Sequence, residues 1–132
     1  MIFETNKDKG RAGMAMGIAY FGANGYTVNI PLNDTQWYDF VVEKDGIFYT
    51  VQCKATGSAD GRIDFRSTGG TNGKVYDILT EHKIDFLFCL DKNQNMYCIP
   101  GNQIPQNQRG ITLKSEKFSN QGFQTYKYLV KI

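Results

Sequence analysis

The chain has 132 residues, of which 41% are hydrophobic and 14% aromatic, so it can build one compact core and is too short for two comfortable domains. Its 15 basic and 13 acidic residues give a net charge of +2, a balance too small to indicate a nucleic-acid partner without clustering. No run approaches the roughly 18 apolar residues of a membrane helix and the first residues lack a signal peptide's apolar core, so we expect one cytoplasmic domain, 1–132, without a membrane partner.

The first predicted element is a helix over residues 7–23. Thr5 and Asp8 have the spacing of a capping box, which satisfies two backbone N–H groups at a helix start. Apolar residues then recur at helical spacing, at Met14, Ile18 and Phe21. Glycines in a helix interior cost about 1 kcal/mol each relative to alanine, which suggests that a sheet or a partner chain approaches this helix closely at Gly10, Gly13 and Gly17.

Three cations crowd the first turns of this helix, Lys7, Lys9 and Arg11. The helix dipole disfavours cations there, whereas a nearby phosphate would make the arrangement favourable. The cluster therefore indicates either contacts with DNA phosphates or a solvated basic helix end.

A short strand is predicted over residues 26–31, and a β-hairpin follows it. The dipeptide Asp45-Gly46 between two β-rich runs predicts a two-residue type I′ turn. Residue 44 then pairs with residue 47, and the same register pairs apolar residues on one face, namely Val42 with Tyr49, Phe40 with Val51 and Tyr38 with Cys53. On the other face the register sets Asp39 opposite Gln52, with Lys54 two residues further along.

The remaining chain alternates between glycine-rich segments and apolar runs. We predict a strand over 62–68 inside a loop or sheet edge, a helix over 75–82, a buried strand over 84–90, its partner over 96–100 and a strand-like run over 123–132. Polar residues of the glycine-rich segment either grip DNA phosphates or belong to a solvated loop: Arg62, Arg66, Ser67, Thr68 and Lys74. The three cysteines lack zinc-site spacing and are predicted to be reduced core residues.

The polar face of the hairpin has the chemistry of a metal site. Oxygens of Asp39 and Gln52, with the main-chain carbonyl of Cys53, suit a hard cation such as Mg²⁺. The ammonium of Lys54 can orient an attacking water or stabilise the charge that grows on a phosphodiester. The same residues also fit an ordinary solvated face of a half-exposed hairpin.

This order of residues resembles the PD-(D/E)XK nuclease superfamily, in which an Asp on one strand is followed by [DEQ]-x-Lys on the next. More narrowly, the segments 9–32, 38–56, 65–70 and 84–100 resemble the small endonucleases associated with group I introns. The resemblance implies an α/β fold with a restriction-endonuclease-like mixed sheet flanked by helices. It also implies that Asp39 binds metal, that Gln52 occupies the second acidic position and that Lys54 is the catalytic lysine.

The resemblance further implies a homing-type endonuclease that cuts double-stranded DNA with Mg²⁺, for which Mn²⁺ can substitute. Cutting two strands needs two active sites, so we expect a homodimer or homotetramer.

One residue departs from the superfamily pattern. Many members carry a Glu on the first helix, which by position falls at Met14, and a thioether is not a ligand for Mg²⁺. Glu4 could substitute, the site could work with fewer acidic ligands, or the chain could have lost cleavage. A Holliday junction resolvase or other structure-selective nuclease of the same fold, and a catalytically inactive module that binds DNA or protein, therefore stay open as alternatives.

Overall fold

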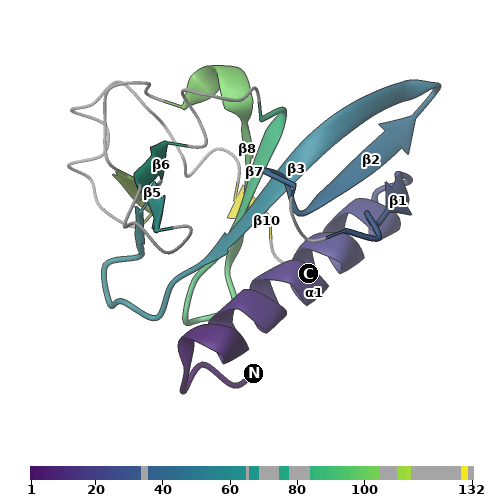
Figure 1. Ribbon diagram of the computed structural model, residues 1–132. Helices are drawn as coiled ribbons and strands as arrows, with labels where there is room; N and C mark the ends of the chain where they lie inside the picture. The colour runs from purple at the N-terminus through teal and green to yellow at the C-terminus, as the bar shows by residue number, and fades with distance from the viewer. Residues whose placement is uncertain are drawn as a thin grey trace.

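A computed structural model describes residues 1–33, 36–64, 66–68, 75–77, 84–104, 110–113 and 129–130, with the backbone alone in 66–68, 75–77 and 129–130. Within these residues one α-helix lies against a six-stranded sheet of order β1-β2-β3-β7-β8-β10 (Figure 1). Neighbouring strands of this sheet are antiparallel except β3 and β7, which are parallel. The mixed α/β architecture predicted from the sequence is thus confirmed. The elements are α1 (Asn6–Ala23), β1 (Thr27–Asn29), β2 (Phe40–Lys44), β3 (Ile47–Ala55), β4 (Arg62–Asp64), β5 (Arg66–Thr68), β6 (Val75–Asp77), β7 (Phe86–Leu90), β8 (Met96–Pro100), the 3₁₀ turn η1 (Gly101–Gln103), β9 (Gly110–Thr112) and β10 (Leu129–Val130).

The predicted capping box starts α1. The Asp8 N–H donates to Thr5 Oγ1 over 3.1 Å, and the Thr5 N–H donates to Asp8 Oδ2 over 3.2 Å. The predicted close approach is made by the protein's own sheet, because a Cβ added at Gly13 would lie 3.3 Å from the Ala55 Cβ. At Gly17 an added Cβ would lie 2.7 Å from the Cys53 Sγ, whereas Gly10 faces open space.

The β2–β3 hairpin has the predicted turn and register. Asp45 and Gly46 both have positive φ, 54° and 80°, as a type I′ turn requires. Pairing runs from Lys44 opposite Ile47 to Phe40 opposite Val51. The predicted pair of Tyr38 with Cys53 is wrong, because the ladder ends at Phe40 and the Cys53 N–H donates to the Asp39 side chain instead.

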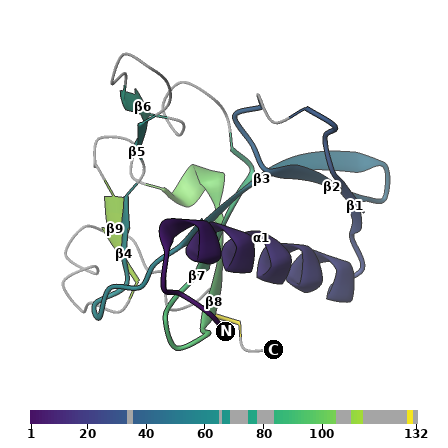
Figure 2. The same ribbon diagram turned by 60° about the horizontal axis from the view of Figure 1, so that its bottom comes forward.

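Each face of the sheet has its own hydrophobic core. Burying one such side chain contributes about 1.5 to 3 kcal/mol relative to leaving it exposed. The core under α1 consists of Phe21, Phe40, Val42, Val51, Phe88, Leu90 and Met96. The core on the opposite face, to which β4 and β9 contribute, consists of Ile63, Leu87, Cys89, Tyr97, Ile99, Ile104, Ile111 and Leu113. Figure 2 shows β4 and β9 side by side, away from α1.

Two predicted elements differ in the structure. The first residues of the predicted helix 75–82 form strand β6, which pairs with β5, in keeping with the strand preference of valine and tyrosine; 78–82 lie outside the described residues. The predicted strand 62–68 contains two strands with different partners, since β4 pairs with β9. No helix in the described ranges has the length and hydropathy needed to cross a membrane.

Candidate active site

Asp39 lies immediately before β2 and is attached to β3 by two hydrogen bonds. Its N–H donates to the Val51 carbonyl over 2.9 Å, and its Oδ2 accepts the Cys53 N–H over 2.6 Å. The turn at Asp45-Gly46 sets the register that brings these groups together. The carboxylate is therefore fixed against the β3 segment that contains Gln52 and Lys54.

Gln52 and Lys54 lie on the sheet face away from α1. Val51 and Cys53 pack toward the helix, and alternate residues of a strand point to opposite faces. The parallel register sets Gln52 beside Leu87 and Lys54 beside Cys89, both members of the second core. Both polar residues are half-buried, so they border this core without being covered by it. Gln52 and Lys54 therefore share one face of β3, next to the residue that holds Asp39, and the convergence of their side chains with the carboxylate stays a prediction.

Burial raises the pKa of the Asp39 carboxyl above its ordinary value, although the Cys53 N–H and the positive charge of Lys54 both lower it. The two favourable interactions therefore do not fully compensate for the water that the carboxylate loses. In the part of the chain that the structure describes, no hydrogen bond reaches the second carboxylate oxygen, Oδ1. A cation beside Oδ1 would supply the missing compensation.

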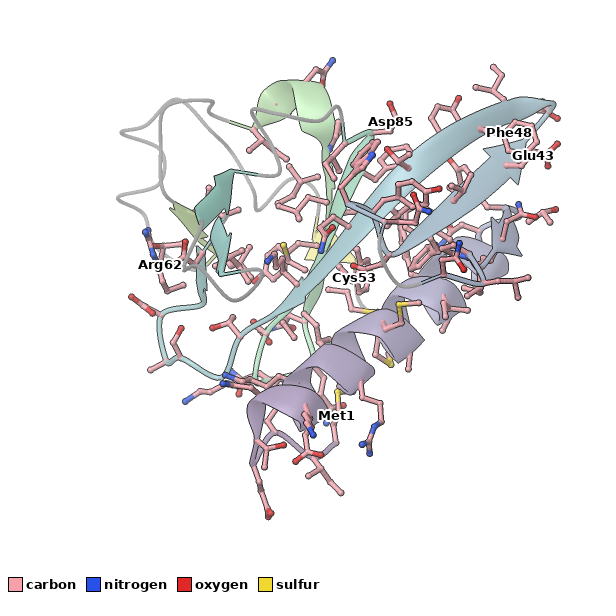
Figure 3. The ribbon with its side chains drawn as sticks, in the orientation of Figure 1. Met1, Glu43, Phe48, Cys53, Arg62 and Asp85 are labelled. Carbon is pink, nitrogen blue, oxygen red and sulfur yellow. The ribbon has the colours of Figure 1, made fainter. Side chains whose placement is uncertain are left out.

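The thiol of Cys53 does not face this site. In Figure 3 Cys53 lies between β3 and α1, where its Sγ occupies the space that a side chain at Gly17 would need. Burial, followed by the charge of Asp39, raises the pKa of this thiol well above its ordinary value, so it is not a thiolate ligand. Cys53 can contribute only its main chain, namely the N–H bound to Asp39 and its carbonyl oxygen.

The available donors are those that a hard divalent cation accepts. Among the described residues, no three His, Cys, Asp or Glu side chains gather in a metal-binding arrangement. A cation here would depend on one carboxylate, one carboxamide oxygen and main-chain carbonyls, a set of oxygen ligands that suits Mg²⁺ better than a thiophilic metal.

The first helix adds no acidic ligand. Met14 is half-buried and packs against the core under α1, as expected. Glu4 is exposed before the start of α1, and among the described residues no contact brings it to Asp39, so its role as the substitute considered above stays a prediction.

The basic residues predicted to contact DNA are only partly described. Lys7 and Arg11 are exposed on the first turns of α1, and the Lys9 Cδ lies 3.7 Å from the Cβ position of Gly57, just beyond β3. Arg62 is exposed on β4, with its guanidinium next to Gly110. The side chains of Arg66, Ser67 and Thr68 and the whole of Lys74 lie outside the described residues.

Sequence reasoning missed a second aspartate that holds β3 from its other side. Asp85 Oδ2 accepts the Thr50 N–H over 2.9 Å, and the Asp85 N–H donates to Thr50 Oγ1 over 3.2 Å. The available signal was the single charge within the apolar run 84–90, since a charged residue in a buried strand requires a partner.

Comparison with known proteins shows the family and the fold in which this candidate site lies. The family described as PD-(D/E)XK endonuclease matches residues 4–128. The fold is similar to that of I-Ssp6803I, a bacterial homing endonuclease, with a TM-score of 0.68 and 20% sequence identity over 95% of this chain and 88% of that chain. No protein of curated function matches the sequence. The restriction-endonuclease-like fold expected from the sequence is confirmed.

Proposed function

The chain belongs to the PD-(D/E)XK endonuclease family, and we propose that it hydrolyses double-stranded DNA at a magnesium-dependent site formed by Asp39, Gln52 and Lys54. Nucleases of this family generally use a divalent metal ion. The observation that supports this site is the Asp39 carboxylate, fixed on the Cys53 N–H beside the two other residues, with a second oxygen to which no described residue donates. We assign this activity to the single domain, 1–132.

Asp39 Oδ1, the Gln52 amide oxygen and the Cys53 carbonyl would hold the ion. When bound, a divalent ion polarises the phosphoryl oxygen and lowers the pKa of a water molecule. Gln52 is neutral where a second carboxylate is more usual, so the site should bind Mg²⁺ weakly and accept Mn²⁺ as a substitute.

Besides the charge of the metal ion, the proposed site has one positive charge from the protein, the ammonium of Lys54. Its ammonium either orients the attacking water or stabilises the charge that grows on the phosphodiester. Its stem lies beside Cys89 of the buried second core, where the lower local dielectric strengthens such interactions.

The fold similarity to a bacterial homing endonuclease supports a site-specific, homing-type enzyme with a long recognition site. Cleavage of both strands then requires two copies, as a homodimer or homotetramer. The exposed cations Lys7, Arg11 and Arg62, with Lys9, would contact the DNA backbone and position the duplex.

The test is cleavage of plasmid, linear duplex and Holliday junction with Mg²⁺ or Mn²⁺. Wild-type protein should cut DNA, Lys54→Ala should not, and Lys92→Ala, at an exposed lysine in the turn after β7, should behave as wild type. Preferential cutting of the junction would favour a structure-selective nuclease over a homing enzyme. Cleavage that survives Lys54→Ala would contradict the site.

A second candidate function rests on Met14. This residue packs into the core at the helix position where many superfamily members carry a metal-binding Glu. Binding of DNA or protein without cleavage under every metal condition would support an inactive binding module on the same fold.

A further inference from the structure

The outer part of the β2–β3 hairpin extends beyond the end of β7. We call the point where the pairing of β3 with β7 begins the fork. β3 pairs with β2 from Ile47 onward, whereas Val51 is the first β3 residue that pairs with β7, opposite Phe86. Asp85 lies at this fork, immediately before the first residue of β7. Figure 3 shows Phe48 and Glu43 further out on the hairpin. Both strands that build the candidate active site, β2 and β3, belong to this hairpin.

Asp85 and Thr50 are joined at the fork by reciprocal hydrogen bonds, which we call the Asp85–Thr50 bracket. Beyond the two bonds to the Thr50 N–H and hydroxyl already described, the Thr50 hydroxyl lies 3.4 Å from Asp85 Oδ2. The Asp85 carbonyl accepts the Gly101 N–H over 2.8 Å, which ties the same residue to η1. Asp85 is thereby fixed by its main chain and its side chain at once.

The bracket lies just before the first pair of β3 with β7, where it can help to set the register of these two strands. A tight turn sets the register of the hairpin, but no turn joins β3 to β7, which are separated in the sequence by residues 56–85. A slip of one residue would move Gln52 and Lys54 to the face covered by α1. The bracket falls two residues before Gln52, on the same face of β3.

We propose that Asp85 is a positioning residue of the nuclease site, which through its bracket on Thr50 fixes the β3 register that holds Gln52 and Lys54 beside Asp39. Two carboxylates then grip β3 from opposite sides, since Asp39 accepts the Cys53 N–H on the β2 side and Asp85 accepts the Thr50 N–H on the β7 side. The inference rests on the proposed function, because it concerns the geometry of that site.

The test compares Asp85→Ala, which removes the acceptor, with Asp85→Asn, which keeps an acceptor oxygen. Glu43→Ala is the matched control, because Glu43 Oε1 also accepts a backbone N–H of this hairpin, that of Gly46 over 3.0 Å, but at the distant tip. Asp85→Ala should lower kcat and raise the half-saturating Mg²⁺ concentration about 10- to 100-fold with KM for DNA unchanged. Asp85→Asn should retain most of the activity, and Glu43→Ala all of it.

A readout without DNA separates this inference from the proposed function. Amide hydrogen exchange of the metal-free protein, resolved by NMR, should show faster exchange at Gln52 and Cys53 in Asp85→Ala, and calorimetry should show weaker Mn²⁺ binding. If the wild type cuts no DNA, the proposed function fails while these two measurements still decide the role of Asp85. If Asp85→Ala lowers only the melting temperature and leaves exchange and cation affinity as in the wild type, Asp85 is merely structural and the inference is overturned.

Discussion

Gly17→Ala tests the contact between α1 and the strand that holds the candidate site. The added Cβ would lie 2.7 Å from the Cys53 Sγ, 3.2 Å from the Phe88 Cδ1 and 3.4 Å from the Phe40 Cζ. Real Cβ atoms do not approach another heavy atom to 2.7 Å, and both rings belong to the packed core, so the added methyl group requires Cys53 or the core around it to shift. Overpacking of this kind costs about 1 to 3 kcal/mol.

Gly10→Ala is the matched control, because it makes the same change in the same helix where an added Cβ meets nothing within 4 Å. Both variants gain about 1 kcal/mol from the helix preference of alanine, so this gain cancels between them. Urea unfolding, followed by circular dichroism, should therefore find Gly17→Ala about 1 to 3 kcal/mol less stable than Gly10→Ala.

The thiol itself can be tested in the same series. Cys53→Ala removes the Sγ and should relieve the crowding, so the double variant Gly17→Ala/Cys53→Ala should show a favourable coupling of about 0.5 to 3 kcal/mol in a double-mutant cycle. Equal stability of Gly17→Ala and Gly10→Ala, or the absence of coupling to Cys53, would refute the close packing of α1 on β3 described above.

Three further results are expected. Asp39→Asn should abolish cleavage in the presence of metal and should raise the melting temperature of the metal-free protein at neutral pH. Burial raises the pKa of the Asp39 carboxyl, so the stabilisation by its protonated form is complete below the unfolded pKa of about 4 and is lost as pH rises through the folded pKa. A metal-free Asn variant that is less stable than the wild type at pH 7 would contradict this. Gln52→Glu adds a charged oxygen ligand and should lower the half-saturating Mg²⁺ concentration in cleavage assays, whereas an increase would place the ion elsewhere. Thr5→Ala should cost about 1 kcal/mol in urea unfolding through loss of the cap of α1, and an unchanged midpoint would argue against the capping box.

Local rules account for the features that the sequence predicted correctly. The capping box at Thr5 involves residues three apart, and the Asp45-Gly46 turn fixes the register of its own hairpin as far as the pair of Phe40 with Val51, so both follow from adjacent sequence. The bracket between Thr50 and Asp85 could not be predicted in this way, because it depends on a parallel pairing between distant segments.

The incorrect helix over 75–82 has a similar origin. Val75 joins a strand pair with β5 that short-range periodicity does not indicate, and tertiary pairing overrides weak local preferences. The same limit applies to the glycines of α1, for which the sequence left open a sheet or a second chain as the neighbour, and only the fold shows that β3 occupies that space.

β3 lies between two hydrophobic clusters, one on each face of the sheet, that have no buried residue in common. Asp39 takes its position from the cluster under α1, through Phe40 and Val51, whereas Gln52 and Lys54 border the other cluster, to which β4 and β9 belong. A library that varies Ile63, Ile111 and Leu113 would thus remodel the surroundings of the amide and the ammonium while the carboxylate keeps its anchor. The two halves of such a centre can be tuned separately by engineering, one from each side of a single strand.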